Sequence, residues 1–263
     1  MINIIRTNGM KNGILKCLFG IALLASFGVQ AQVANYTVTQ TNWATGYTTL
    51  PLSGRAILAT AGGASVDDAV YPLSMPFTFV FNGVGYTSVN MSTNGFVYFG
   101  TATGTPASEY FPISSATTNY TGGAISVYGR DLDLISPTTT VNMGWVVTGT
   151  APNRVFKMDW ITRRSSGASA APPGETSMIF QLWLYETTNV IEMIYNTATF
   201  GSTTTYTGQI GLRGASNTDF KNLTYTTATA QWPGSATTPN QMAFGTLNTD
   251  AVVTRGTTAA AAT

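Results

Sequence analysis

Two carboxylates that could do chemistry stand two positions apart, at Asp131 and Asp133. Side chains at positions i and i+2 of a β-strand point to the same face, so a strand here would present both acids together. Such a pair can serve as the acid and base of a glycoside hydrolase, or as oxygen ligands of Ca²⁺. Because Arg130 is adjacent, we favour turn or ion-pair roles for both acids. A structural calcium ion at this pair is the open alternative.

Other nucleophilic and metal chemistry is restricted by composition. The chain has no histidine, and its only cysteine is Cys17, which lies in an apolar N-terminal segment. A Ser-His-Asp or Cys-His site and a His-ligated zinc are therefore excluded. The mature chain has neither a disulfide nor a reactive thiol. We predict that this protein is not an enzyme and needs no cofactor.

Aromatic rings and cations offer a second kind of site. Trp183 and Tyr185 alternate along one predicted strand, and flat rings of this kind can pack on sugars. Arg163 and Arg164 are adjacent and could bind an acidic polysaccharide. The plainer interpretation is that rings at strand spacing fill a sandwich core or cover its open face, and that the arginines are solvated. The rings considered for a sugar platform are Trp145, Trp160, Trp183, Tyr128, Tyr185 and Tyr195.

The charge content is low for a soluble domain. Charged residues make up 9% of the 263 residues, and hydrophobic residues make up 44%. Without Arg6, Lys11 and Lys16, nine basic residues face eleven acidic ones. No basic surface for nucleic acid is predicted. The abundant Thr favours strands, because β-branched side chains pack well on a pleated sheet.

The first 31 residues have the pattern of a secretory signal peptide. Lys11 and Lys16 precede the apolar run Leu18–Val29, and Val29–Gln30–Ala31 is a small-residue cleavage site. The run is too short to span a membrane as a helix. We expect residues 1–31 to be removed, residues 32–253 to form one domain, and residues 254–263 to be a tail or linker. The expected location is extracellular or on the cell surface, without membrane insertion after cleavage.

The centre of the domain is predicted to be a three-stranded meander between Tyr71 and Gly100. Asn82–Gly83 and Asn94–Gly95 each stand between apolar and β-branched residues, as in tight hairpin turns. Before the first turn, Phe77, Phe79 and Phe81 alternate with smaller residues, so one face of that strand carries three rings.

Further strands are predicted at short spacing, with turn signals between them. Their segments are Ala56–Ala59, Ala124–Tyr128, Met143–Val147, Val155–Ile161, Met178–Tyr185, Val190–Tyr195, Ile210–Leu212 and Met242–Phe244. Thr101–Thr121 and Thr162–Gly174 lack periodicity and are predicted to be long exposed loops. In the Met178–Tyr185 strand, Phe180, Leu182 and Leu184 should share one face. The pattern predicts an all-β, antiparallel sandwich of jelly-roll type.

Several short motifs lie along the predicted domain. They are Met75–Phe79, Phe81–Gly83, Ser92–Phe96, Gly129–Asp133, Ala151–Val155, Phe180–Tyr195, Ile210–Gly214, and Asn217–Phe220 with Trp232. Together they resemble a group of secreted β-sandwich modules from Bacteroidetes. Part of the pattern, around Ser92–Gly95, is also similar to nidogen-like extracellular domains.

The resemblance implies a module at the N-terminus of surface proteins that carry a type IX secretion signal. Such modules are described as adhesive or scaffolding, and they have no agreed catalytic residues to transfer. We therefore expect a non-catalytic module for adhesion or scaffolding at a bacterial surface, with surface glycans or other extracellular proteins as partners. The alternatives are a carbohydrate-binding module of a degradative protein and, less favoured, a glycoside hydrolase that uses Asp131 and Asp133.

Overall fold

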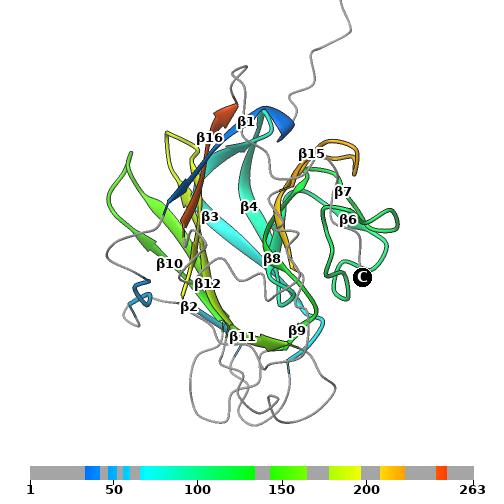
Figure 1. The fold of residues 1–263 in the computed structure, drawn as a ribbon. Coiled ribbons are helices and arrows are strands. Elements are labelled where there is room, and N and C mark those ends of the chain that lie inside the picture. The colour runs from blue at the N-terminus through cyan, green and yellow to red at the C-terminus, as the bar shows by residue number, and fades with distance from the viewer. Residues whose placement is uncertain are drawn as a thin grey trace, which may run out of the picture. The chain divides into compact units, whose positions relative to one another are not determined.

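The computed structural model describes residues 33–41, 47–51, 56–59, 66–133, 143–164, 178–196, 208–222 and 241–247. Within these ranges the chain is almost entirely β-structure, with one short 3₁₀ helix (Figure 1). The elements are η1 (Val33–Asn35), β1 (Tyr36–Thr41), β2 (Ala56–Ala59), β3 (Val70–Phe81), β4 (Val84–Ser92), β5 (Phe96–Tyr98), β6 (Ala102–Thr103), β7 (Asn119–Tyr120), β8 (Ala124–Gly129), β9 (Leu132–Asp133), β10 (Met143–Thr148), β11 (Val155–Arg164), β12 (Met178–Tyr185), β13 (Ile191–Tyr195), β14 (Gln209–Arg213), β15 (Phe220–Asn222) and β16 (Gln241–Leu247).

A six-stranded antiparallel sheet contains the predicted meander. Its strand order is β15-β14-β8-β5-β4-β3, so β3, β4 and β5 are neighbours in sequence and in space. The β3–β4 turn has positive φ at both Asn82 and Gly83, which is the requirement of a type I′ hairpin. The β4–β5 connection has three residues, Thr93 to Gly95, and of its Asn-Gly pair only Gly95 has a positive φ. The meander is confirmed, with two different turns.

An eight-stranded antiparallel sheet forms the other layer. Its order is β1-β16-β13-β12-β11-β10-β2, and β9 pairs with the end of β11. The strands from β10 to β13 follow one another in the chain, and β12 begins and ends as predicted, at Met178 and Tyr185. Each predicted strand segment has a counterpart in one of the two sheets.

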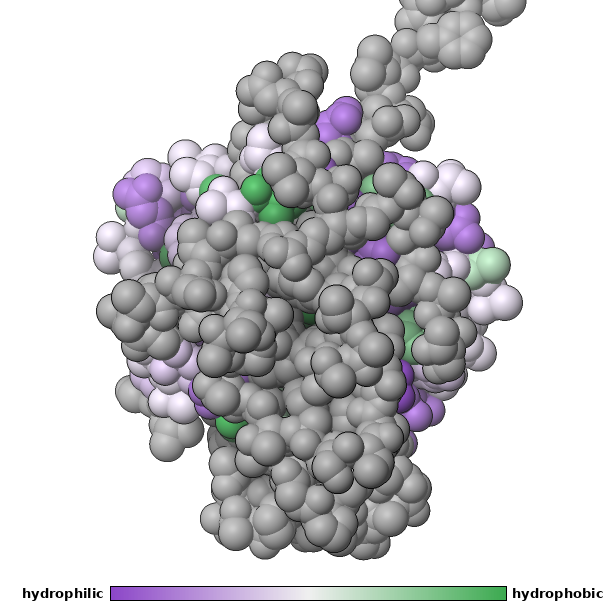
Figure 2. All heavy atoms as spheres, in the orientation of Figure 1, coloured by the Kyte–Doolittle hydropathy of each residue, from purple (hydrophilic) through white to green (hydrophobic). Residues whose placement is uncertain are grey.

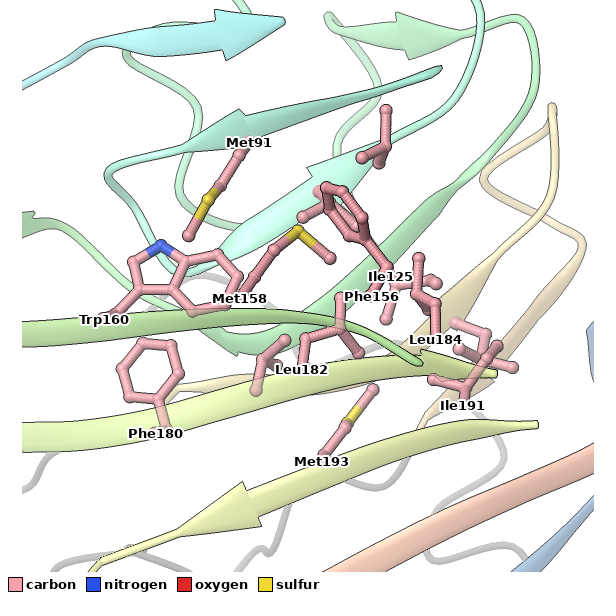
Figure 3. Close-up of a cluster of buried hydrophobic side chains, with 14 of the residues drawn as sticks. Met91, Ile125, Phe156, Met158, Trp160, Phe180, Leu182, Leu184, Ile191 and Met193 are labelled. Carbon is pink, nitrogen blue, oxygen red and sulfur yellow. The ribbon is translucent and has the colours of Figure 1, made fainter. Parts of the chain in front are cut away.

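The inner faces of the two sheets pack on one another and form one core. Figure 3 shows Met91 of β4 and Ile125 of β8 directed toward side chains of β11 and β12. Trp160 Nε1 of β11 donates to the Ser92 carbonyl of β4 at 2.8 Å, and the Tyr195 hydroxyl of β13 donates to the Val127 carbonyl of β8 at 2.6 Å. Burying each large apolar side chain contributes about 1.5–3 kcal/mol. The expected antiparallel β-sandwich is confirmed.

The three rings of β3 lie in this core. Phe77, Phe79 and Phe81 are buried, while Thr78 and Val80 between them are exposed. On β12, Phe180, Leu182 and Leu184 are likewise buried on the face predicted for them. The period-two pattern therefore assigned the correct residues to the interior.

The prediction that Thr101–Thr121 is a long exposed loop is confirmed in part: apart from the short strands β6 and β7 it has no regular structure, but it is not exposed throughout. The segment from β6 to β7, which we call the strap, packs several of its side chains on the outer face of the six-stranded sheet. Phe111, Ile113 and Tyr120 of the strap are buried, and Tyr120 contacts the rings of Phe96 and Tyr98. The physical reason is that β5 has bulky side chains on both faces, so its outer face also needs a cover.

Arg213 of β14 holds the strap in place. It is fully buried, and its Nη1 atom donates to the carbonyls of Pro112 at 2.8 Å and Ser115 at 2.9 Å. Its Nη2 atom donates to Asn119 Oδ1 at 3.2 Å. Gln209, on the same face of β14, accepts from the Ile113 amide at 2.9 Å. The polar side chains of one strand thus satisfy the backbone groups of the strap.

The loop predicted for Thr162–Gly174 is wrong at its beginning. Thr162, Arg163 and Arg164 are the last residues of β11, and Thr162 is buried. The strand continues because β9 adds to its end, with Arg163 opposite Asp133 and Arg164 opposite Leu132. Residues 165–174, the predicted signal peptide 1–31 and the tail 254–263 lie outside the described residues.

Candidate functional site

The outer face of the eight-stranded sheet carries a row of polar and aromatic side chains. In the strand register, Lys157 of β11 is opposite Trp183 of β12, and Trp183 is opposite Glu192 of β13. All three are half-buried. They alternate with core residues along their strands, which is why they lie on the outer face together. We call them the outer row.

A cation–π contact joins two side chains of the outer row. Lys157 Nζ lies 3.5 Å from the centre of the Trp183 ring, so the ammonium covers one face of the indole. Trp183 Nε1 donates to Gln181 Oε1 at 2.8 Å. Partial burial lowers the pKa of Lys157, and the nearby Glu192 carboxylate opposes this shift. The indole is therefore fixed in orientation by its neighbours.

Tyr185 and Glu192 form the next contact along this face. The Tyr185 hydroxyl donates to Glu192 Oε2 at 2.6 Å. Burial, followed by this hydrogen bond to a carboxylate, raises the pKa of Tyr185. A neutral phenol at physiological pH can hold the carboxylate in place but cannot act as a base. Glu192 stands between the buried Ile191 and Met193 on β13, so it faces away from the core.

A short segment covers the buried end of the same face. Gln181 is fully buried although it points away from the core, and its Nε2 atom donates to the Tyr47 hydroxyl at 2.8 Å and the Thr48 carbonyl at 3.0 Å. Leu50, two residues further along, is also buried. On the outer face of β12, Gln181 is thus covered, whereas Trp183 and Tyr185 are half-exposed.

The six rings considered for a sugar platform do not share one face. Trp160, Tyr128 and Tyr195 are buried in the core between the sheets. Trp145 packs against the same core and stacks on Phe156, with ring centres 4.9 Å apart. Trp183 and Tyr185 are the two that lie on the outer face. Most of these rings therefore fill the core, as the simpler interpretation of the sequence expected.

Arg163 and Arg164 are not brought together with the aromatic pair. Lys157, which is opposite Trp183, stands six residues before Arg163 on β11. At a rise of about 3.3 Å per residue, this separates the two positions by roughly 20 Å along the strand. The four residues predicted to bind ligand thus belong to two separate places on the sheet.

The predicted acid pair lies in a larger group of carboxylates. Asp133 is buried in β9, while Asp131 precedes the strand and is half-exposed. Partial burial, then Asp68, Asp131 and Asp133 in turn, raise the pKa of Asp67. Among the described residues, no three carboxylate, imidazole or thiol side chains converge in a way that could hold a metal ion.

Asn94 is a site residue that the sequence pattern assigned only to a turn. Its side chain is buried, and Nδ2 contacts Asp68 Oδ1 at 3.1 Å and the carbonyls of Ala107 and Glu109 at 3.2 Å each. Asn94 Oδ1 accepts from the Leu132 amide at 3.0 Å. One amide group therefore joins the meander, the strap and the start of β9. A buried Asn is not distinguishable from an exposed one in the sequence alone.

Glu186 has a structural partner in the described structure. Its carboxylate receives two hydrogen bonds from the Arg154 side chain, from Nε at 2.8 Å and from Nη2 at 2.6 Å, and a third from the Arg154 backbone amide at 3.0 Å. This pairing lowers the pKa of Glu186 to about 2. Arg154 also lies over the Phe77 ring, 5.5 Å from its centre. The pair thus connects the turns before β11 and after β12 and rests against β3 of the other sheet.

Comparison with known protein families shows which family this chain belongs to. A family model described as NIDO related matches residues 35–254, which include every described strand. The chain belongs to the NIDO-related family. This is not a known enzyme family, and the nidogen-like similarity noted from the sequence agrees with the assignment. No curated protein and no solved structure matches this chain.

The described part of this NIDO-related chain has a single helix, the three-residue η1. No helix within the described ranges is long and apolar enough to cross a membrane.

Proposed function

We propose that this NIDO-related chain is a secreted, non-enzymatic β-sandwich module that acts in adhesion or scaffolding at a bacterial cell surface. The observation that carries the proposal is the family match over residues 35–254, because it covers the sandwich as a whole. The described polar side chains also support a binding role. The side chains of the outer row and of Gln181 are held in place by hydrogen bonds and by the contact of Lys157 with Trp183. Side chains that are already ordered lose less entropy when a partner binds.

The outer row favours a protein partner over a glycan. A sugar ring needs an open aromatic face, whereas one face of Trp183 is covered by the Lys157 ammonium. Lys157 and Glu192 on either side of the indole present opposite charges in one line across three strands. An extracellular protein surface with complementary charges and one apolar group would fit this arrangement.

The binding surface can be tested on immobilised extracellular proteins and polysaccharides. We expect the wild type to bind a protein ligand, and the variant Trp183→Ala to reduce that binding by tenfold or more, the effect of losing a hot-spot aromatic residue of about 2 kcal/mol. The matched control is Val84→Ala, which removes an exposed apolar side chain from the other sheet. Retention on glycans alone, with loss in Trp183→Ala, would instead support the carbohydrate-binding alternative.

The absence of enzymatic function is tested by incubating the protein with polysaccharides and assaying new reducing ends. We expect none above background. Hydrolysis by the wild type that is lost in Asp131→Asn would contradict the proposal and favour the glycoside hydrolase hypothesis.

Melting with and without a chelator tests for bound calcium at Asp131 and Asp133. An unchanged transition would agree with a module that needs no cofactor.

Export is proposed to follow removal of residues 1–31. Val33 is fully buried, and its amide donates to Asp219 Oδ1 at 2.8 Å, so a packed residue of the domain stands two residues after Ala31. Expression of the whole chain in a bacterial host, followed by N-terminal sequencing of the exported form, tests this. A start at residue 32 is expected. A start beyond Val33, or retention of the leader, would argue against the proposed site.

A further inference from the structure

Two identical dipeptides of this chain carry the same latent chemistry. In Asn82–Gly83 and Asn94–Gly95, the backbone nitrogen of Gly can attack the side-chain carbonyl carbon of Asn, because Gly has no side chain to hinder the approach. Their surroundings differ, so their reactivity should differ.

Asn82–Gly83 stands at the tip of the β3–β4 hairpin. Gly83 is exposed and Asn82 is half-buried. Asn82 Nδ2 makes one long contact, 3.4 Å to Asp219 Oδ2, and Oδ1 is buried without a hydrogen-bond donor among the described residues. Within the described residues, one long hydrogen bond is therefore all that holds this side-chain amide group.

Asn94–Gly95 is enclosed. Besides the contacts of the Asn94 amide with Asp68, the strap and Leu132, the Gly95 carbonyl accepts from the amides of Val127 and Tyr128 at 3.1 and 3.0 Å. Both residues are buried. Attack within this pair requires these hydrogen bonds to open first.

We propose that Asn82 is a site of spontaneous deamidation in the folded protein and that Asn94 is protected from it. The Gly83 nitrogen bonds to Cγ of Asn82 and loses its proton, and the side-chain nitrogen leaves as ammonia. The resulting cyclic imide is then opened by one water molecule. Opening at one carbonyl gives aspartate, and opening at the other gives isoaspartate, with no change of oxidation state.

The product would disturb the attachment of the N-terminal segment. Asp219 receives the Asn82 contact on one oxygen and the Val33 amide on the other. A carboxylate at position 82 would repel Asp219 instead of donating to it. Isoaspartate would also lengthen the backbone of the turn. The backbone N–H of Asn82 donates to the Tyr36 hydroxyl of β1 at 2.9 Å, so this bond would be disturbed as well. Deamidation at this tip should therefore loosen η1 and β1.

The rates are measured on the folded secreted protein, incubated at physiological temperature and mildly alkaline pH, by peptide mass spectrometry that separates aspartate from isoaspartate. Asn82 should react faster than Asn94 by roughly tenfold or more. This factor corresponds to the free-energy cost of opening one buried hydrogen bond at Asn94. In denaturant the two rates should become similar, which serves as the control for intrinsic reactivity. Equal rates in the folded protein, or faster reaction at Asn94, would overturn the proposal.

The consequence is tested with Asn82→Asp as a mimic of one product. Its melting temperature should fall below that of Asn82→Gly, which tolerates the positive φ and removes the amide without adding charge. The difference should shrink as the pH is lowered and the carboxyl groups are protonated. Equal melting temperatures for the two variants would show that repulsion at Asp219 plays no part, and would overturn the proposed effect on the N-terminal segment.

Discussion

At the scale of single residues, a few polar side chains join segments that are distant in sequence. Asn94 connects three of them through one amide group, and Arg154 and Glu186 connect two turns. For the buried Asn94 this pairing matters, because an unpaired donor or acceptor in the interior costs its desolvation penalty.

We expect Asn94→Asp to lower the free energy of unfolding by about 3 kcal/mol or more, since the carboxylate cannot donate to Asp68 or to the two strap carbonyls. Urea denaturation measures the change. Asn90→Asp is the matched control, because Asn90 is only half-buried and donates to the Gly100 carbonyl at 3.1 Å. A loss at Asn94 no larger than that at Asn90 would contradict the role assigned to this amide.

The pair of Arg154 and Glu186 predicts how stability depends on pH. Because the pKa of Glu186 is lowered to about 2 from its ordinary 4.5, its contribution is complete above pH 4.5. It is then lost as the pH falls from there through about 2. We expect Glu186→Gln to melt a few degrees below the wild type at neutral pH and to converge with it in acid. Parallel curves over this pH range would argue against the pairing.

At the scale of elements, the six-stranded sheet has a covered outer face and a protected edge at β3. The strap covers the outer face of β5, β8 and β14. At the edge strand β3, Pro72 and Pro76 have no amide to donate, and the Val80 amide donates to Asn189 Oδ1 of the β12–β13 turn at 2.8 Å. This edge is therefore a poor template for pairing with another chain.

Arg213→Met should release the strap while the core between the sheets remains. The carbonyls of Pro112 and Ser115 lose their donor, at a cost of roughly 2–4 kcal/mol. Hydrogen exchange should become faster in residues 101–121 and stay slow in β11 and β12. Arg213→Lys is the control that keeps the charge but not the forked geometry, and it should recover only part of the protection. Uniform acceleration in both sheets would contradict a local role.

At the scale of the whole molecule, the larger of the two buried clusters in the described structure lies between the two sheets. The surface agrees with this, because the described atoms in view in Figure 2 are mainly pale or purple, with small areas of green. Hydrogen bonds from Trp160 and Tyr195 cross the core and fix how the sheets face each other.

Trp160→Phe should lower the free energy of unfolding by about 1–3 kcal/mol, because it leaves the buried Ser92 carbonyl without its donor and opens a small cavity. Trp145→Phe is the matched control, since Trp145 is only half-buried beside the core. Chemical denaturation compares the two. An equal loss in both variants would mean that the bond between the sheets contributes nothing beyond ring volume.

The local pattern was sufficient for the strands and much of the core. Alternation identified the buried faces of β3 and β12, and the Asn-Gly pairs located two turns. The strap and the end of β11 could not be predicted in this way. Their conformation depends on partners distant in the chain, Arg213 and β9, and no periodicity in a Ser- and Thr-rich segment records such a partner.

The sequence by itself determined the class of this protein, a β-sandwich without histidine, because composition and period-two patterning act within a few residues. Tertiary structure alone decided which polar residues matter. It divided two identical Asn-Gly pairs into a half-exposed turn and a buried junction, and it divided the described tryptophans between the core and the outer row. The physical reason is that burial and hydrogen bonding depend on contacts across the sandwich, which are set only when both sheets are assembled.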